Sequence, residues 1–357
     1  MLYKEDWQSA QEHFNAWWNN EIIDRCLIQA FAPKKNTKIE PNAWSVWALA
    51  HNRDNFEFVV NEFEKYCRQT FFGGEAFPCF WINLGPGTVA SYIGSNPVFR
   101  EDTVWFEQVS NFENMDISFD ENNKWWKFSK DVTSFVAEKG KDKYITGITD
   151  LGGITDVLAS LRGTETLLFD LTENPQRIKQ YSEKITDVWI KSYSELDKAI
   201  KKTGMKGTSG WMGIWSEKRY APLQCDFSAM ISPNMFREFA LPYLDRLFAS
   251  MEHPIYHLDG PGEICHLDML LDCPNLKGIQ WVPSPGPDNT GSPKWFEMYK
   301  KIQSKNKLLV LQGMPANKIE GLLKEISSKG VLITTALDSE DEAKDLLKKA
   351  EKWAVGA

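Results

Sequence analysis

Two side chains that can carry protons or bind a metal ion stand two residues apart in the segment from Tyr256 to Val282. His257 and Asp259 end an apolar run and precede a Gly-Pro-Gly turn. Residues two apart on a β-strand point to the same face. Histidine transfers protons near neutral pH and is a common metal ligand. We therefore predict that His257 and Asp259 are catalytic, and that they are the ligands of any bound metal ion.

Two further carboxylates are predicted to be catalytic. Asp226 lies in a largely apolar loop ahead of Ser232, where desolvation would raise its pKa and suit it to acid–base work. A turn or capping role for Asp226 is the alternative. Asp150 ends an apolar run just before a glycine pair, whereas Asp156, after that pair, is expected to start a helix.

Polar and planar side chains near other turns are candidates for binding a substrate. Arg219 would clamp a carboxylate or phosphate group, with a surface ion pair as the alternative. Cys265 and His266 follow the Gly-Pro-Gly turn and are expected to pack on the core rather than to bind metal. The predicted substrate-binding residues are Glu75, Asn83, Trp215, Arg219, Tyr220, Gln224, Trp281 and Gln312.

Eight short apolar runs must position these groups, and helical patterns lie between them. Continuous apolar runs are typical of strands that are covered on both faces. Glycine or proline stands at most of their ends. The predicted strands are 26–32, 79–84, 144–150, 207–215, 254–260, 277–282, 307–313 and 330–336.

Strands alternating with helices predict the α/β class and a (β/α)8 TIM barrel, in which active sites lie at the C-terminal ends of the strands. We expect one domain over 1–357, with an N-terminal helical extension and an insertion near the barrel mouth at about 100–130. A doubly wound open sheet is the alternative. It would favour a glycine-rich loop after the first strand, and residues 30–35 (AFAPKK) do not form one.

Composition limits the partners. The formal net charge is −8 and no basic tract is dense, which argues against nucleic acid. No run approaches the roughly 20 apolar residues of a membrane span, and the N-terminus lacks the pattern of a signal peptide. Six cysteines without a CxxC pair suggest free thiols and a cytoplasmic location. Fifteen tryptophans suit either a core or a sugar-binding surface.

Four segments resemble the uroporphyrinogen decarboxylase-like superfamily, which includes corrinoid-linked methyltransferases, and the resemblance spans about 20–350. They are GITDLGGITDVLASLRGTETLLFDL, QCDFSAMISPNMFREFALPYLDRL, YHLDG and LQGMP. The resemblance implies the same (β/α)8 barrel.

The chain departs from the family at several positions. Asn83 stands where the decarboxylases carry a key aspartate, and their active-site tyrosine falls near Ala159. The arginine-rich N-terminal loop and the cysteine zinc ligands of the family are missing from this sequence. A thiolate-rich zinc site is thereby excluded. A harder site, with His257, Asp259 and Glu75 around a divalent ion such as zinc, is the expectation.

The resemblance implies an enzyme that acts on a small organic substrate at the barrel mouth. Methyl transfer is the first expectation, with a corrinoid carried by a partner protein. Decarboxylation of a carboxylated, porphyrin-like substrate is the second. A carbohydrate-active enzyme and a non-catalytic binding protein are the alternatives of other classes. Barrels of this class often form homodimers.

Overall fold

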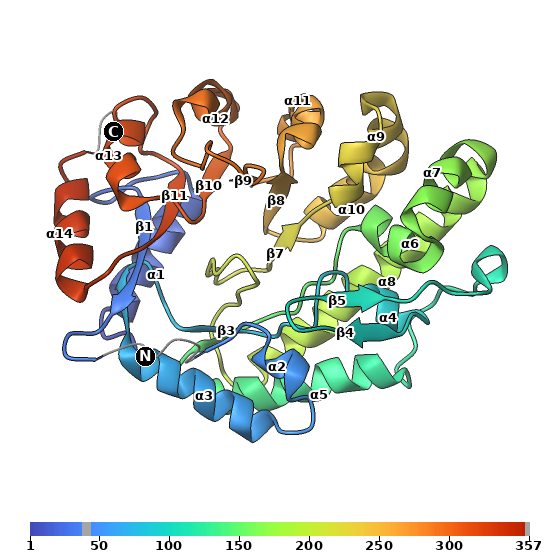
Figure 1. The fold of residues 1–357 in the computed structure, drawn as a ribbon, viewed down its shortest axis with the longest axis horizontal. Helices are drawn as coiled ribbons and strands as arrows, with labels where there is room; N and C mark the ends of the chain where they lie inside the picture. Colours follow the sequence, from blue (N-terminus) through green and yellow to red (C-terminus); the bar gives the residue numbers. More distant parts are fainter. Residues whose placement is uncertain (38–43, 354–357) are drawn as a thin grey trace.

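The computed structural model describes residues 1–37 and 44–353, and its architecture is mixed α/β. Seven strands form one sheet in the order β2-β1-β11-β10-β9-β8-β7 (Figure 1), and every pair in it is parallel except β1 with β2. Strands β3 and β6 form a separate parallel pair, and β4 and β5 an antiparallel hairpin. The strands are β1 (Leu27–Pro33), β2 (Thr70–Gly74), β3 (Cys79–Trp81), β4 (Pro97–Phe99), β5 (Val104–Phe106), β6 (Ile145–Gly147), β7 (Tyr220–Leu223), β8 (His253–Asp259), β9 (Gly278–Val282), β10 (Leu308–Leu311) and β11 (Val331–Ala336).

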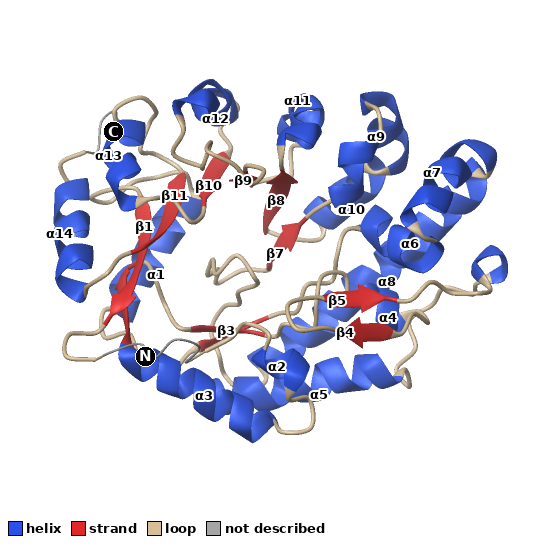
Figure 2. Cartoon of the chain, viewed as in Figure 1, coloured by secondary structure: helices blue, strands red, loops and turns tan. Residues whose placement is uncertain are grey.

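Most helices lie on the outside of the strands (Figure 2), as expected where crossover helices cover parallel strands. Among the described residues, no helix combines the length and the apolar character that crossing a membrane requires. The α-helices are α1 (Trp7–Trp18), α2 (Ala48–His51), α3 (Phe56–Gln69), α4 (Val89–Tyr92), α5 (Lys124–Gly140), α6 (Ile154–Arg162), α7 (Thr164–Glu173), α8 (Pro175–Lys201), α9 (Pro233–Phe239), α10 (Leu241–Ala249), α11 (Leu267–Leu271), α12 (Phe296–Ser304), α13 (Ala316–Leu323) and α14 (Glu340–Ala350). Short 3-10 turns are η1 (Phe112–Asn114), η2 (Asp226–Met230), η3 (Pro261–His266) and η4 (Pro293–Trp295).

The α/β class is confirmed, and a helix, α1, precedes the first strand as predicted. The first strand, β1, pairs with the last, β11, which is the neighbour relationship that a barrel needs. Among the described residues, however, no ladder joins the β3–β6 pair to the seven-stranded sheet, and Gly147 of β6 makes only an isolated parallel bridge to Ser209, which precedes β7. The ladders therefore do not make one continuous ring, and closure into a barrel stays a prediction.

Seven of the eight predicted strands are present, although several are shorter than expected. The fourth prediction, residues 207–215, is wrong, and the strand of this region is β7 instead. Gly207 (φ +80°) and Gly213 (φ +62°) have left-handed backbone conformations that a regular strand does not accommodate. The apolar side chains of this run, among them Trp215, pack with Phe14 of α1 in a core cluster.

Local sequence signals explain the helix boundaries near the site. Ser232 caps α9 by accepting a hydrogen bond from the backbone N–H of Met235 over 3.3 Å, and Pro233 takes the first helical position. Ser339 likewise caps α14, whose first turn is acidic. The apolar positions of the long helix α8 at spacings of three and four are buried, which fixes α8 against the core.

Candidate active site

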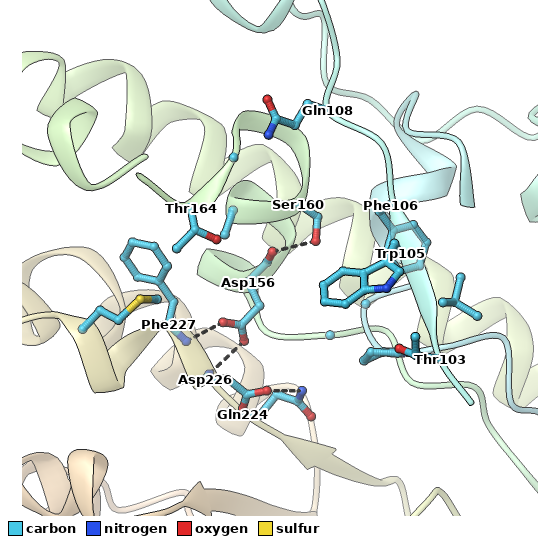
Figure 3. Close-up of a pocket in the computed structure, with 17 residues that line it drawn as sticks. Thr103, Trp105, Phe106, Gln108, Asp156, Ser160, Thr164, Gln224, Asp226 and Phe227 are labelled. Atoms are coloured by element: carbon cyan, nitrogen blue, oxygen red, sulfur yellow. Dashed lines mark hydrogen bonds between the residues drawn. The ribbon is translucent and has the colours of Figure 1, made fainter. Parts of the chain in front are cut away.

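A cavity of about 520 Å³ opens between the β4–β5 hairpin, helix α6 and the segment that follows β7 (Figure 3). Its lining includes Gly152 after β6 and Gln224 after β7, so it lies at the carboxyl ends of these strands. The 103–108 part of the predicted insertion forms one wall. Ala159, near which the tyrosine of the resembled family was expected to fall, also lines the cavity, and its small side chain leaves space.

Asp156 anchors the segment that carries Asp226. Its carboxylate accepts hydrogen bonds from the backbone N–H of Asp226 over 3.1 Å and of Phe227 over 2.7 Å (Figure 3). Asp156 lies in the first turn of α6, as predicted, but it also lines the cavity. The sequence analysis did not predict this second role of Asp156. The glycine at position 153 was a sign of close packing here, because a Cβ at Gly153 would lie 2.2 Å from the Asp156 carboxylate and 2.3 Å from the Gln224 carbonyl.

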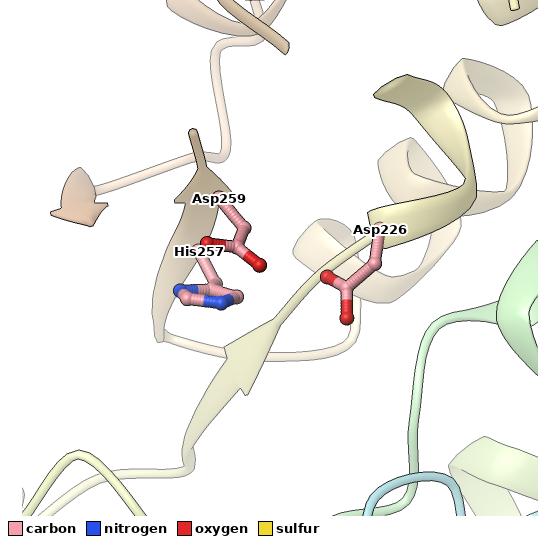
Figure 4. Close-up of side chains that lie close together, drawn as sticks. All are labelled: Asp226, His257 and Asp259. Atoms are coloured by element: carbon pink, nitrogen blue, oxygen red, sulfur yellow. The ribbon is translucent and has the colours of Figure 1, made fainter. Parts of the chain in front are cut away.

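Three predicted catalytic residues come together beside this cavity. One possible ligand atom from each of Asp226, His257 and Asp259 lies within 4.8 Å of the others (Figure 4). His257 and Asp259 extend from the end of β8, and Asp226 starts η2. We call these residues the Asp-His-Asp cluster. The alternation of side chains along a strand placed His257 and Asp259 on one side, as expected.

A chain of amides orients His257. Its Nδ1 donates a hydrogen bond to Gln280 Oε1 on β9. Gln280 Nε2 donates to Gln312 Oε1 over 3.1 Å, and Gln312 Nε2 donates to the carbonyl of Met212 over 2.8 Å. Because amide oxygens accept and amide nitrogens donate, this order keeps the proton of neutral His257 on Nδ1. The Nε2 lone pair is then free for a metal ion or a proton.

The acids of the site are held in an unusual state. Desolvation raises the pKa of Asp156 and Asp226 to about 7, although Asp226 is exposed at the cavity, and nearby carboxylates add to the effect. Burial and Asp226 raise the pKa of Glu263 to about 9. Burial lowers the pKa of His257 despite its hydrogen bond to Gln280. The acids therefore share protons near neutral pH, and a cation that entered would displace them.

Asp150 is the fourth predicted catalytic residue, and it lies close to the cavity. It follows β6 and accepts a hydrogen bond from the backbone N–H of Gly152 over 2.8 Å. Burial raises its pKa to about 7, and the charge of Asp156 contributes. Its carboxylate perturbs Asp226 electrostatically. It is therefore part of the same acidic group, although it is not among the three possible metal ligands.

Four of the predicted substrate-binding residues lie at or behind this region. Gln224 lines the cavity. Gln312 belongs to the amide chain that starts at His257. Trp281 on β9 is fully buried and packs edge-on against Trp295 at 4.9 Å, so it supports the site from the core. Asn83 is buried after β3, where it donates to the Val46 carbonyl and accepts from the Gly85 backbone, so its polar groups serve the loop.

The other four predicted substrate-binding residues are used elsewhere. Trp215 is buried in the cluster with α1, and its Nε1 donates to the Lys206 carbonyl. Arg219 and Tyr220 stand where β7 begins, whereas Asp226 follows the end of β7. Arg219 and Tyr220 therefore lie at the N-terminal end of β7, and Asp226 lies beyond its C-terminal end.

Glu75 is in a buried ion pair rather than beside His257. Arg25 donates to both of its carboxylate oxygens over 2.7 and 2.9 Å, and the Ile28 backbone N–H donates over 2.8 Å. Although burial alone would raise the pKa of Glu75, the Arg25 charge and the hydrogen bond from His13 lower it to about 2. Asp226, not Glu75, is the third member of the cluster.

No family model matches this chain, and no curated protein matches it in sequence. Among solved structures, a methyltransferase from Methanosarcina mazei superposes on it with a TM-score of 0.61. The superposition covers 96% of this chain and 98% of that chain, at 13% sequence identity. The α/β fold is therefore one that this chain shares with a methyltransferase.

Proposed function

We propose that this protein is a metal-dependent enzyme that transfers a methyl group to or from a small organic substrate. The observation that carries the proposal is the Asp-His-Asp cluster beside a cavity of about 520 Å³, a normal size for a small-molecule site. The methyltransferase with the same fold supports the choice of reaction.

The donor set fits a divalent ion. Carboxylate oxygens and an imidazole nitrogen bind zinc, and three protein ligands with an open position are typical of catalytic zinc. The amide chain from Gln280 supplies the orienting partner that metal-bound histidines have. Asp226, His257 and Asp259 would hold the ion. When bound, such an ion acts as a Lewis acid that favours the deprotonated form of a coordinated thiol or hydroxyl group.

The chain's own residues then divide the work. Asp156 holds the Asp226 backbone in place, and Gln280 keeps the His257 ring in one tautomer. A carboxylate of the site accepts the proton that the methyl-accepting heteroatom loses. That heteroatom takes the methyl group, and the donor keeps the bonding electron pair. A corrinoid carried by a partner protein stays the predicted methyl carrier. The cavity suits a small molecule, so such a carrier would meet the site at its opening.

Metal analysis of the purified protein tests the proposal. We expect about one zinc or similar divalent ion per chain. We expect its loss in His257→Ala and weaker binding in Asp226→Asn and Asp259→Asn. His51→Ala, which changes an exposed histidine, is the matched control and keeps the metal. Metal-free wild-type protein that also fails to take up zinc in a calorimetric titration would contradict the metal site.

The reaction is tested separately, with methylcobalamin as the donor and a panel of thiols and alcohols as acceptors. We expect loss of the methylcobalamin absorbance to need the metal and His257. A protein that holds its metal but never demethylates the donor would refute methyl transfer from a corrinoid while leaving the metal site intact.

Decarboxylation is the second candidate, because acids with a pKa of about 7 can protonate a developing carbanion. It predicts release of carbon dioxide from a carboxylated ligand, abolished in Asp226→Asn. The site opposes a substrate with many carboxylates, however. Among the described residues, the cavity is lined by Asp156 and Asp226 and by no lysine or arginine. A porphyrin-like polyanion would meet repulsion there.

A further inference from the structure

The cavity has two unlike walls (Figure 3). Trp105 and Phe106 of β5 form one side. In Figure 3 the other side carries the carboxylates of Asp156 and Asp226, together with the ring of Phe227. Aromatic faces carry partial negative charge, so the ring of Trp105 and the ionised carboxylates both attract cations.

Trp105 is the most unusual residue of the aromatic wall. It is 66% exposed, although it lies in a hairpin whose neighbouring residue Val104 is buried. Its ring faces Asp156 across the cavity (Figure 3). Met230, 49% exposed, lies on the rim of the same cavity. Large apolar side chains left open at the edge of a cavity are typical of ligand-binding sites.

Gln224 provides an independent sign of a ligand. The residue is only 5% exposed, yet it lines the cavity. Its Nε2 has one contact, 3.5 Å from Asp226 Oδ2, and its Oε1 has no hydrogen-bond partner among the described residues. This oxygen is not among the fully buried atoms that lack a partner, so it is open to the cavity. An amide oxygen is a hydrogen-bond acceptor and the negative end of the amide dipole, so it favours a positively charged group there.

The charge of the lining decides the sign of the ligand. Within the described part of the chain, neither lysine nor arginine lines the cavity, so no lining side chain with a permanent positive charge neutralises Asp156 and Asp226. A cation would stabilise the ionised form of both acids, which a neutral ligand would not do. An anion would be repelled by them.

We propose that this cavity binds a small organic cation, an amine or quaternary ammonium compound, with its charged end between Trp105 and the carboxylates of Asp156 and Asp226. The inference rests on the proposed function in one respect: because Asp226 also belongs to the Asp-His-Asp cluster, the bound cation is the methyl donor. Its C–N bond breaks, the nitrogen keeps the bonding electron pair and leaves as a neutral amine, and the methyl group passes to the acceptor of the proposed reaction. The aromatic ring would contact the alkyl groups of the cation, as in other sites for ammonium ligands.

Isothermal titration calorimetry tests the inference with four probes. Choline is the quaternary probe, trimethylammonium chloride the protonated amine, 3,3-dimethylbutan-1-ol the neutral isostere of choline and pivalate the anion. We expect at least one of the two cations to bind and the neutral and anionic probes not to bind. The better cation identifies whether the site prefers an N–H donor or a fully alkylated nitrogen. Equal binding of choline and its neutral isostere, or no binding of either cation, overturns the proposal.

Two substitutions locate the site. Trp105→Leu keeps an apolar side chain but removes the ring, and we expect about fivefold weaker cation binding. Asp156→Asn removes one charge, and we expect about tenfold weaker binding. Phe169→Leu, which changes an equally exposed aromatic residue outside the cavity, is the matched control and leaves binding unchanged. If the cation binds equally well to both cavity variants, the cavity is not its binding site. If Asp156→Asn disturbs the fold, Trp105→Leu still tests the proposal.

The test is separable from that of the metal site. Binding is measured in His257→Ala and in protein treated with a chelator as well as in the wild type. We expect the cation to bind in all three, because Trp105, Asp156 and Gln224 need no metal. Loss of metal with retained cation binding would leave the present inference standing. Retained metal with no cation binding would refute it and leave the metal site intact.

Discussion

Asp156 and Asp226 are joined by a hydrogen bond of 3.1 Å, from the backbone N–H of Asp226 to Oδ2 of Asp156, and the next N–H, of Phe227, donates to Oδ1 over 2.7 Å. One carboxylate on α6 thus fixes the first turn of η2. That turn places the Asp226 side chain toward His257 and Asp259 (Figure 4). The geometry of the possible metal site therefore depends on a residue that is not one of its three members.

Replacing Asp156 should separate its anchoring role from its charge. Asp156→Ala leaves two N–H groups without their acceptor, and we expect it to lower the free energy of unfolding by about 1–3 kcal/mol. Asp156→Asn keeps one acceptor and should lose less. Urea denaturation measures both, with the exposed Asp116→Asn as the control. If Ala and Asn proved equally stable, the carboxylate would not be the anchor.

The sequence could predict the cluster in part. The period of a strand placed His257 and Asp259 on one face, and Asp226 stood out as an acidic residue in a largely apolar loop ahead of Ser232. It could not supply the Asp156–Asp226 hydrogen bond, which joins residues 70 positions apart. The sequence also could not predict what Trp215 packs against. An apolar run looks the same whether it packs beside a neighbouring strand or, as here, against helix α1.

The same limit applies to the fold. Short apolar runs predicted seven strands because buried parallel strands have a simple pattern. The strand β7 was missed because Tyr220–Leu223 is short and contains Pro222, which interrupts the usual signal. Glu75 was expected at the site because it stands in a glycine-flanked turn. Its partner Arg25, 50 residues away, was visible in the sequence but not assignable to it.

Gln280 is predicted to control metal affinity without touching the metal. In Gln280→Leu, His257 Nδ1 loses its acceptor and both tautomers become accessible, so we expect metal affinity to fall about 10- to 100-fold. Gln280→Glu keeps an acceptor and should retain most of the affinity. A competition titration against a chelator measures the affinity, and nitrogen NMR of the histidine reports the tautomer. Unchanged affinity in Gln280→Leu would rule out the orienting role.

Glu75 is predicted to stabilise the fold and not to bind ligand. Glu75→Gln leaves the buried Arg25 charge unpaired, and we expect a loss of about 3–5 kcal/mol in the free energy of unfolding. Asp341→Asn breaks the exposed pair with Lys35 and should cost less than about 1 kcal/mol. Folded Glu75→Gln protein should bind the metal and the cation probes as the wild type does. A specific loss of ligand binding at normal stability would restore Glu75 to the site.

His253 is predicted to make stability depend on pH. It is buried at the start of β8, stacks on Trp18 at 4.1 Å and shares a hydrogen bond of 2.8 Å with Ser216 Oγ. Burial, with the nearby charges of Lys218 and Lys277, lowers the pKa of His253 from 6.5 to about 3. The folded state therefore binds a proton less readily than the unfolded state. The contribution of His253 to stability is complete above pH 6.5 and is lost progressively as the pH falls toward 3.

His253→Gln removes this titration while keeping a polar side chain. We expect the free energy of unfolding, measured by urea denaturation from pH 7.5 to pH 4.5, to fall less steeply with decreasing pH in the variant than in the wild type. His51→Gln changes an exposed histidine and should keep the wild-type slope. Because other acids titrate in the same range, the difference between the variant and the wild type is the quantity that reports His253. If the two stability curves had the same slope, the His253 side chain would be protonated equally readily in the folded and unfolded states. A neutral His253 ring stacked on Trp18 would then be the wrong description of this end of the sheet.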